Sequence, residues 1–363
     1  MTRKQCFDGG NNLKISLVVP CRNEKAHICE FLDSLLAQEL DPDWKLEILV
    51  ADGLSDDGTR DVLKQYSERA RNVRMIDNPG RIVSTGLNAA IAAASGDIII
   101  RMDGHTIYAP DYVRECVNVL WESGADNVGG PWVAKGKGVV GKAIAAAFHS
   151  PFCIGGGKAH DPSYEGDVDT VYLGCWLRAT FDKVGLFDPN LVRNQDDELN
   201  FRLKRAGGRV WQSPRIRSWY TPRASISALF RQYLQYGFWK VAVIRKHRAL
   251  ASWRHVVPVV FVSSILGAVT AITFAAMFGI SGPAWLISAG LAIELLVYVV
   301  ACVAAAVPFF GSLPLSSLLL LPVVIASYHV AYGLGFVIGL FKPATQVPEG
   351  EGAPAQFFTT LTR

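Results

Sequence analysis

Two polar side chains, Asp103 and His105, follow an apolar run and could together bind a divalent metal ion. The run Ile98-Ile99-Ile100 has the composition of a strand buried on both faces, and such strands belong to parallel sheets covered by helices. Ligands of open α/β sheets bind beyond the carboxyl ends of the strands, so both side chains are expected at that edge. A carboxylate and a neutral imidazole are ordinary ligands of Mg2+ or Mn2+. Because Asp-Gly pairs also form simple turns, a plain turn at Asp103-Gly104 is the alternative.

A second carboxylate, Asp52, ends an apolar segment in the same way. Residues 46–52 read Leu-Glu-Ile-Leu-Val-Ala-Asp, so a strand there would bring Asp52 to the same sheet edge as Asp103. In a nucleotide site, Asp52 could accept hydrogen bonds from a ribose or base while Asp103 holds a metal ion on the diphosphate. Arg81 follows Pro79-Gly80, and its guanidinium matches phosphate oxygens in bidentate geometry, although a surface arginine needs no such role.

Three consecutive acids, Asp196, Asp197 and Glu198, precede a helical pattern at 199–206. Carboxylates at the start of a helix stabilise its dipole by roughly 0.3–1 kcal/mol each. Repulsion within the cluster also raises one pKa, and a carboxylate tuned in this way can act as a general base. The residues alone leave both interpretations open, a helix cap and a base.

Strand and helix patterns alternate through the first hundred residues. The expected strands are the run that ends at Asp103 and three earlier segments, 13–20, 46–52 and 73–78. Helical segments of about a dozen residues lie between them. This alternation predicts a parallel sheet with right-handed crossovers, and therefore an α/β domain of nucleotide-binding type.

Glycines 136, 138 and 141 have the spacing of a dinucleotide-binding fingerprint. We expect no such site there, because 127–133 contains Gly129-Gly130-Pro131 and no clear strand precedes the glycines. The small apolar segment 139–154 is instead expected to form a helix on the membrane surface or along an acceptor groove.

An aromatic and basic helix is expected at 229–240. Its Arg231 and Gln232 could contact phosphate, and Trp239 could stack on an acceptor sugar. Anchoring at the headgroup boundary of a membrane is the alternative, and the two roles are compatible.

The composition divides the 363 residues into a charged part and an apolar part. Between 256 and 341 the only Asp, Glu, Lys or Arg is Glu294. Three stretches, 256–280, 284–308 and 315–341, are long enough to cross a hydrocarbon core about 30 Å thick. Basic residues cluster between 240 and 254, just before the first stretch, and positive loops stay cytoplasmic. The sequence therefore predicts a multi-pass protein of the inner (cell) membrane with its charged part in the cytoplasm.

Charge and cysteine content exclude two classes of protein. The net charge of +4 is modest and suits a domain beside an anionic leaflet better than one that binds nucleic acid. The seven cysteines form no Cys-x-x-Cys pair, and their odd number argues against a disulfide framework.

In combination, these motifs resemble a family 2 glycosyltransferase of the GT-A fold over residues 14–240. Val-Pro-Cys-Arg-Asn-Glu at 19–24 resembles the opening V-P-x-x-N-E, and Ala51–Thr59 resembles the D-D-G-S-x-D-x-T segment. Asp103-Gly104-His105 stands in place of the D-x-D metal motif, and Gln195–Glu198 resembles E-D-x-E. The helix with Arg231, Gln232 and Trp239 stands where many members carry Q-x-x-R-W, although that match is partial. The apolar tail and Asp-x-His resemble the succinoglycan-chain glucosyltransferase branch.

The resemblance implies a mixed, mostly parallel sheet and hexosyltransferase activity. It implies an inverting reaction in which Asp196 is the base and Mg2+ or Mn2+ is bound by Asp103 and His105. A UDP-sugar would be the donor, and a lipid-linked saccharide in exopolysaccharide biosynthesis the acceptor. Asp52 and Glu24 would hold the nucleoside, and Arg81 or Arg231 would contact the diphosphate. The full set of predicted cofactor- and substrate-binding residues is Pro20, Arg22, Glu24, Asp52, Arg81, Asp103, Arg231, Gln232 and Trp239.

Two other functions are the alternatives. One is a polyprenyl-phosphate sugar synthase, which needs no strong base, and the other is a membrane-anchored sugar-nucleotide-binding scaffold without catalysis. The expected domains are a tail at 1–12, the transferase domain at 13–228, interfacial helices at 229–255, transmembrane helices at 256–341 and a tail at 342–363.

Overall fold

A computed structural model describes residues 13–104, 106–250, 252–280, 282 and 284–342. The chain forms two compact units. We call Met1–Val133 with Lys158–Thr221 the sheet unit, and Ala134–Gly157 with Pro222–Arg363 the helical unit. The segment 134–157 thus leaves the sheet unit and belongs with the C-terminal helices. The domain boundaries expected from the sequence stay predictions.

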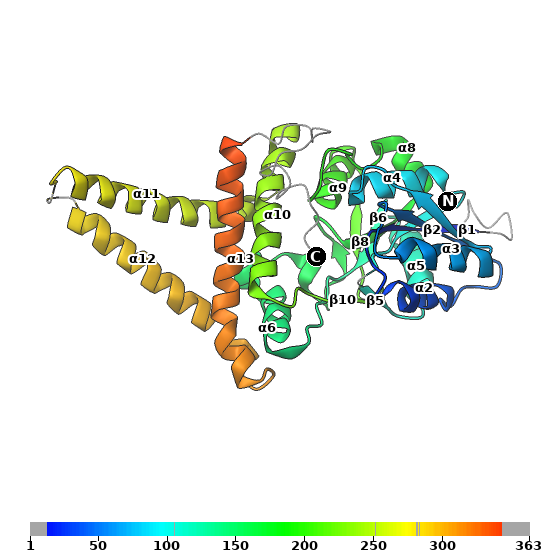
Figure 1. The fold of residues 1–363 in the computed structure, drawn as a ribbon, viewed down its shortest axis with the longest axis horizontal. Helices are drawn as coiled ribbons and strands as arrows, with labels where there is room; N and C mark the ends of the chain where they lie inside the picture. The colour runs from blue at the N-terminus through cyan, green and yellow to red at the C-terminus, as the bar shows by residue number, and fades with distance from the viewer. Residues whose placement is uncertain (1–12, 105, 251, 281, 283, 343–363) are drawn as a thin grey trace. The chain divides into compact units, whose positions relative to one another are not determined.

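An eight-stranded sheet forms the centre of the sheet unit (Figure 1). Its strand order is β3-β2-β1-β4-β8-β6-β9-β7. The strands are β1 (Lys14–Cys21), β2 (Lys45–Asp52), β3 (Val73–Asp77), β4 (Ile98–Arg101), β6 (Asn127–Gly130), β7 (Gly166–Asp167), β8 (Tyr172–Leu177) and β9 (Val210–Gln212). The first four run parallel, whereas β8 is antiparallel to both β4 and β6. This is the mixed, mostly parallel sheet that the sequence predicts.

The helices of the sheet unit bury apolar faces against this sheet. They are α2 (Ile28–Leu36), α3 (Thr59–Arg69), α4 (Val83–Ala93), α5 (Tyr112–Ser123), α8 (Arg178–Val184) and α9 (Gln195–Arg205), with a 3-10 turn η1 at Lys158–His160. In α2 the buried residues Ile28, Phe31, Leu32 and Leu35 follow the 3–4 spacing of one helix face. A small second sheet pairs β5 (Thr106–Tyr108) with β10 (Ser218–Tyr220).

The expectation that no strand lies at 127–133 is wrong. Asn127–Gly130 forms β6, which is fully buried and pairs with β8 and β9. The two glycines are needed because neighbouring segments pass very close. A Cβ on Gly130 would lie 2.0 Å from the carbonyl oxygen of Ile216, and one on Gly129 would lie 2.7 Å from the Val171 side chain. Close approach, and not a turn, explains the glycine pair.

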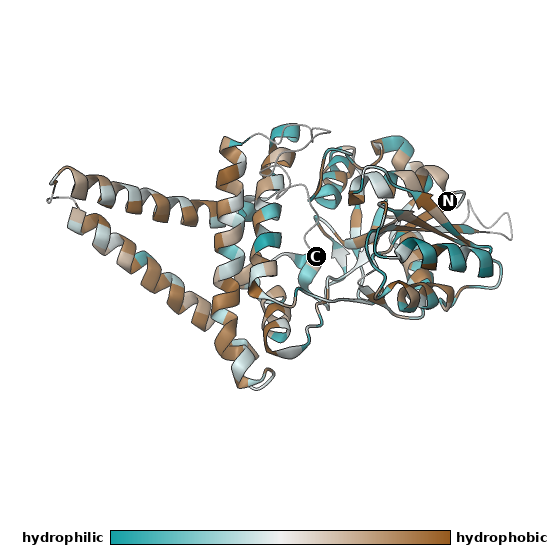
Figure 2. Cartoon of the chain, in the orientation of Figure 1, coloured by the Kyte–Doolittle hydropathy of each residue, from teal (hydrophilic) through white to brown (hydrophobic). Residues whose placement is uncertain are grey.

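Among its described residues, the helical unit contains three helices long and apolar enough to span a membrane, as the sequence predicts. These candidate spans are Trp253–Met277, Ala284–Phe309 and Leu315–Phe341, and Figure 2 shows apolar residues along them. The unit's elements are α6 (Gly138–Phe148), α7 (Pro151–Ile154), α10 (Ile226–His247), η2 (Trp253–His255), α11 (Val257–Met277), α12 (Ala284–Ala304), η3 (Val307–Phe309) and α13 (Leu315–Phe341). Glu294 on α12 accepts a 2.5 Å hydrogen bond from Ser264 on α11, so its carboxyl has a polar partner in the apolar region.

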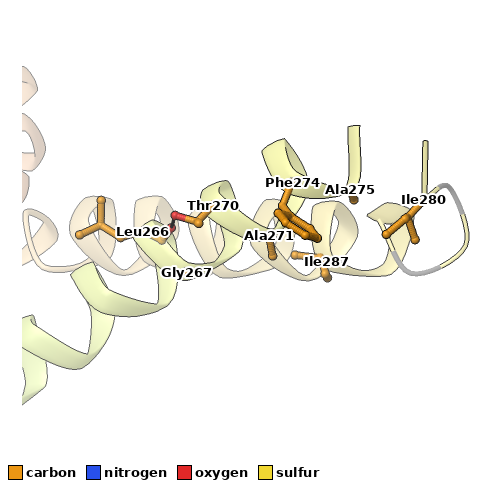
Figure 3. A pocket seen from close by; sticks show the side chains of 8 residues that line it. All are labelled: Leu266, Gly267, Thr270, Ala271, Phe274, Ala275, Ile280 and Ile287. Carbon is orange, nitrogen blue, oxygen red and sulfur yellow. Dashed lines mark hydrogen bonds between the residues drawn. The ribbon is translucent and has the colours of Figure 1, made fainter. Parts of the chain in front are cut away.

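An apolar groove of about 550 Å³ lies between α11 and α12 (Figure 3). Its lining includes Leu266, Phe274 and Ile287. The lining also includes Thr270, whose hydroxyl donates a hydrogen bond to the Leu266 carbonyl. No charged side chain lines this groove. It therefore offers no group for the chemistry predicted at the sheet edge.

Glycines bring α10 and α13 into close contact, and the two helices lie side by side (Figure 1). A Cβ on Gly237 would lie 2.0 Å from the Tyr332 carbonyl oxygen, and one on Gly335 would lie 2.0 Å from that of Leu234. Small residues at such crossings let apolar helices pack backbone to backbone. The aromatic helix at 226–247 is thus fixed along a candidate membrane span.

We expect Gly335→Val to loosen this contact, because its added carbons have no room beside Leu234. Overpacking of this kind costs about 1–3 kcal/mol or more. The detergent-solubilised variant should therefore unfold at a lower temperature than the wild type. Gly290→Val on α12 is the control, since a Cβ there meets nothing within 4 Å. Equal melting temperatures for the Gly335 variant and the wild type would contradict the close contact.

Candidate active site

The parallel strands deliver the predicted acids to one edge of the sheet. Asp52 at the end of β2 pairs with Cys21 of β1 and with Asp77 of β3. On the other side of β1, Arg101 of β4 pairs with Val18, which places Asp103 just beyond the same edge. The structure therefore brings Asp52 and Asp103 to a common rim, as the strand pattern predicts.

The hydroxyl of Tyr108 fixes the backbone at Asp103. The Asp103 amide donates to the Tyr108 oxygen at 2.7 Å, and the hydroxyl donates back to the Asp103 carbonyl at 3.1 Å. The Thr106 amide also donates to that carbonyl, at 3.1 Å. Tyr108 is buried, and burial followed by the charge of Asp103 raises the pKa of its hydroxyl well above the usual value. The hydroxyl therefore stays protonated and able to donate.

Arg101 joins the two acids for which the sequence predicts chemistry. Its Nε and Nη2 donate to the two carboxylate oxygens of Asp103 at 3.0 and 2.9 Å, and its Nη1 donates to Oδ1 of Asp196. The Arg101 side chain is only 5% exposed. Burial alone would lower the pKa of Arg101, but the charges of Asp103 and Asp196 raise it above the usual value, so the guanidinium is permanently charged.

Asp196 lies in the first turn of α9 and keeps a partly exposed side chain. Its side chain is 32% exposed, and Asn194 before the helix adopts a left-handed backbone with φ of 61°. Burial raises the pKa of Asp196 above its usual value; Arg101 opposes this shift, and the charges of Asp103 and Asp197 add to it. Asp196 is therefore an accessible carboxylate of raised basicity, the property that a general base requires.

The other members of the acidic motif have different surroundings. Glu198 is fully buried, and Arg202 binds both of its oxygens at 2.9 Å. Arg202 also donates to the carbonyls of Val184 and Leu186, so this pair connects α9 to the end of α8. Gln195 is buried as well. Within the cluster, the exposed carboxylate next to the rim is thus that of Asp196 rather than Glu198.

Asp52 is fully buried and is occupied by protein donors. Its Oδ1 accepts from the Ser55 hydroxyl at 2.5 Å, and its Oδ2 accepts from the Ser55 amide at 3.0 Å and from Arg60 at 2.7 Å. Arg60 also donates to Asp77 at 2.8 Å. Asp52 thus organises the loop that follows β2. Contact between Asp52 and a nucleoside stays a prediction.

Side chains link the loop after β1 to the loop after β2. The Asn23 amide donates to the Ser55 hydroxyl at 2.8 Å, and the Glu24 amide donates to the Thr59 hydroxyl at 2.9 Å. A Cβ on Gly104 would lie 3.8 Å from the Glu24 carboxyl carbon, so Glu24 lies beside the Asp103 loop. Of the other predicted donor-binding residues, Pro20 lies near the end of β1, and the Arg22 side chain packs over Gly53.

Left-handed backbone conformations cluster in these loops. Asn23, Leu54 and Arg81 have φ of 54°, 55° and 57° in the loops after β1, β2 and β3. A residue other than glycine in this left-handed conformation costs of order 1–3 kcal/mol of folding free energy, and strain of this kind concentrates at binding sites. Arg81 itself is exposed on this rim, in the position from which the sequence predicts a contact to diphosphate.

The three predicted residues of the helical unit lie on α10. Arg231 is exposed. Gln232 is buried and accepts from Arg223 at 3.0 Å while it donates to Tyr236 at 3.2 Å. Trp239 is only 3% exposed, with its ring 5.7 Å from that of Phe238. Their roles toward phosphate and acceptor sugar stay predictions.

The rim has donor groups that suit Mg2+ or Mn2+. The side chain of Asp103 is 13% exposed, and each of its carboxylate oxygens accepts one hydrogen bond from Arg101. Among the described residues, no group of three acidic, histidine or cysteine side chains could hold a metal. Mg2+ commonly binds through one or two carboxylates together with substrate phosphates, so Asp103 fits this arrangement. His105 lies outside the described residues.

Comparison with known proteins identifies the family. Residues 16–179 match the model of glycosyl transferase family 2. The succinoglycan biosynthesis protein ExoA of Rhizobium meliloti (strain 1021) is 34% identical over 258 residues, which cover 70% of this chain and 78% of that protein. The chain belongs to glycosyl transferase family 2. It is therefore a glycosyltransferase, and its sheet unit has the GT-A fold.

One further relative and one solved structure are also similar to this chain. A glucuronosyltransferase of Methanococcus voltae is 28% identical over 64% of this chain and 74% of its own length; its name specifies dolichyl N-acetyl-α-D-glucosaminyl phosphate. Among solved structures, a mannosyltransferase from Pyrobaculum calidifontis in complex with GDP-Man and Mn2+ matches with a TM-score of 0.57 at 19% identity. That match covers 90% of this glycosyltransferase and 87% of the mannosyltransferase, and it supports the fold.

Arg101 and Tyr108 are the residues at this rim that our sequence analysis missed. One signal was available for Arg101, a charge inside the apolar segment 98–102, which requires a buried partner. Residues two apart on an extended strand face the same way, so Asp103 was the nearest candidate partner. No local pattern distinguishes Tyr108 from an ordinary core tyrosine.

Tyr108→Phe should lower the transfer rate by up to about a hundredfold, because small misplacements of a reacting group have effects of that size. The variant loses both hydrogen bonds to the Asp103 backbone. Tyr112→Phe is a matched control, since the buried Tyr112 hydroxyl has no hydrogen-bond partner among the described residues. Initial rates with a labelled donor test this. Equal rates for the two variants would show that the Tyr108 hydroxyl does not position Asp103.

Glu198→Gln should destabilise the protein by about 1–3 kcal/mol while leaving much of the activity of the folded fraction. The carboxylate that binds Arg202 is lost, but the exposed edge of Asp196 is not altered. Thermal unfolding and specific activity should be measured together. Unchanged stability combined with loss of transfer would instead assign Glu198 a chemical role.

Proposed function

We propose that this glycosyltransferase moves a hexosyl group from a nucleotide-sugar to a hydroxyl of a lipid-linked saccharide, with inversion at the anomeric carbon. The observation that carries the proposal is the linked set at the rim, in which Arg101 joins Asp103 to the partly exposed Asp196. The set combines a carboxylate suited to a cation with a second carboxylate of raised pKa.

In this proposal, the loops after the parallel strands bind the donor, a UDP-sugar. Pro20, Arg22, Glu24 and Asp52 would form the nucleoside site, since they belong to the two cross-linked loops after β1 and β2. Arg81 would contact the diphosphate in bidentate geometry from its exposed position on the rim. Asp103 and His105 would hold Mg2+ or Mn2+.

Asp196 would remove the proton from the attacking hydroxyl. A base works best when its pKa lies near the working pH, and the raised pKa of Asp196 moves it in that direction. When bound, the divalent ion supplies positive charge to the departing nucleoside diphosphate. Arg101 and Tyr108 would hold the two carboxylates in place during the displacement.

The helical unit supports a membrane acceptor. In the part of the chain that the structure describes, three helices are long and apolar enough to span a bilayer. The last turn of α10, just before the first of them, carries Arg245, Lys246 and His247. Positive segments stay on the cytoplasmic side, so the sheet unit would be cytoplasmic on an inner-membrane protein. Arg231, Gln232 and Trp239 of α10 would then contact the acceptor or its phosphate. The similarity to a succinoglycan biosynthesis protein supports a role in exopolysaccharide biosynthesis.

Asp196→Asn tests the acceptor chemistry. Loss of the base should reduce transfer to a hydroxyl by several orders of magnitude while donor binding is retained, and Asp197→Asn is the control from the same helix turn. Labelled UDP- and GDP-sugars with membrane lipid extract provide the assay. A mild effect would favour a lipid phosphate acceptor, as in a polyprenyl-phosphate sugar synthase, because a phosphate needs no strong base.

The same assay tests whether the protein is catalytic at all. Metal-dependent hydrolysis or transfer should occur with at least one donor, and Asp103→Ala should abolish it. If no donor is hydrolysed or transferred by the wild-type chain, the protein is a sugar-nucleotide-binding scaffold and the enzyme proposal fails.

A further inference from the structure

We propose that Arg101 is a positioning residue that competes with the divalent cation for Asp103 and thereby links donor binding to the placement of Asp196. The inference rests on the proposed function, in which Asp103 binds the cation. Arg101 belongs to none of the motifs by which this chain resembles the family, so the resemblance gives it no role. Three features of the structure support it.

The first feature is the shape of the guanidinium. Arg101 uses Nε and Nη2 for Asp103 and Nη1 for Asp196. These donors are held in one plane, so the two carboxylates lie at fixed positions around a rigid group. A lysine ammonium in the same place would supply a point charge without this geometry. Arg101 thus sets the position of the predicted base relative to the predicted cation ligand.

The second feature is the charge of the set. One guanidinium faces two carboxylates, and the guanidinium is almost completely buried. At Asp103, a divalent cation would supply charge of the same sign as the guanidinium, so the two would act on the same carboxylate. In the structure, Arg101 covers one lone pair on each oxygen of Asp103, so it reduces what Asp103 can offer to a cation.

The third feature is the length of the connection. Arg101 and Asp103 are two residues apart on one strand end, whereas Asp196 comes from α9, 95 positions further along the chain. Within the described residues, Arg101 provides a direct side-chain link between them. If a cation binds Asp103 and weakens its bonds to Arg101, the guanidinium keeps its bond to Asp196. Cation binding at Asp103 therefore changes the contacts that hold Asp196.

Competition between Arg101 and the cation predicts that removal of Arg101 strengthens metal binding but slows sugar transfer. Arg101→Met should bind Mn2+ more tightly, by about fivefold or more, a typical size for coupling between sites. The same variant should transfer sugar more slowly, by up to about a hundredfold, since Asp196 loses its positioning partner. A general loss of structure would weaken both properties.

The experiment uses the full chain in detergent and Mn2+ alone, with free Mn2+ followed by electron paramagnetic resonance. Wild type, Arg101→Met and Arg101→Lys are compared, and Asp103→Asn added to Arg101→Met should abolish the tighter binding. Arg178→Met is the matched control, because Arg178 is another arginine of the sheet unit and donates to the backbone carbonyls of Gly96 and Ile91. Thermal unfolding reports whether each variant is folded.

Tighter Mn2+ binding with slower transfer in Arg101→Met would support the inference. If that variant does not fold, Arg101→Lys must show slower transfer with Mn2+ binding no weaker than wild type. Equal or weaker Mn2+ binding in the folded variant overturns competition at Asp103. This failure is distinct from failure of the proposed function, in which the wild-type chain transfers sugar from no donor.

Discussion

The ion pairs of Arg101 are the constraint on which the rim of the sheet depends. β4 is buried along its whole length, and a guanidinium at its end is stable only if carboxylates compensate its charge. Asp103 and Asp196 meet this requirement from two distant parts of the chain. The need to compensate one buried charge therefore helps to bring a predicted metal ligand and a predicted base to the same place.

The loops around this rim are also held in place by contacts between segments that are distant in the sequence. The parallel strands end in register, so short loops after β1, β2 and β3 converge on one rim. These loops contain residues in left-handed conformations, which cost free energy in isolation. Hydrogen bonds between the loops hold them in place. Asp52 contributes to this order from inside, through Ser55 and Arg60. Residues of the family-like segments 19–24 and 51–59 thus maintain the shape of the rim.

The helical unit obeys a different physical rule. Apolar helices in a bilayer gain little from burying apolar surface, so their packing depends on close contact. Gly237 and Gly335 provide that contact between α10 and α13. Some polar groups within the apolar helices pair with one another, as Glu294 does with Ser264 and Tyr298 does with His329. The chain therefore combines an α/β sheet that positions charged groups with a helical part suited to lipid.

Several features follow from the sequence alone, because they depend on local patterns. Strand and helix periodicity predicts a parallel sheet, and the family resemblance implies that the sheet is mixed and mostly parallel. The near absence of charge from 256 to 341 predicts the apolar helices. Asp52 and Asp103 reach one rim because parallel strands end at the same edge. The strand β6 was missed, since its glycines reflect a close approach of Ile216 and Val171 that no local pattern contains. Only the tertiary structure decides that Arg101 connects Asp103 to Asp196, because a buried charge requires partners but the sequence does not say which distant ones it meets.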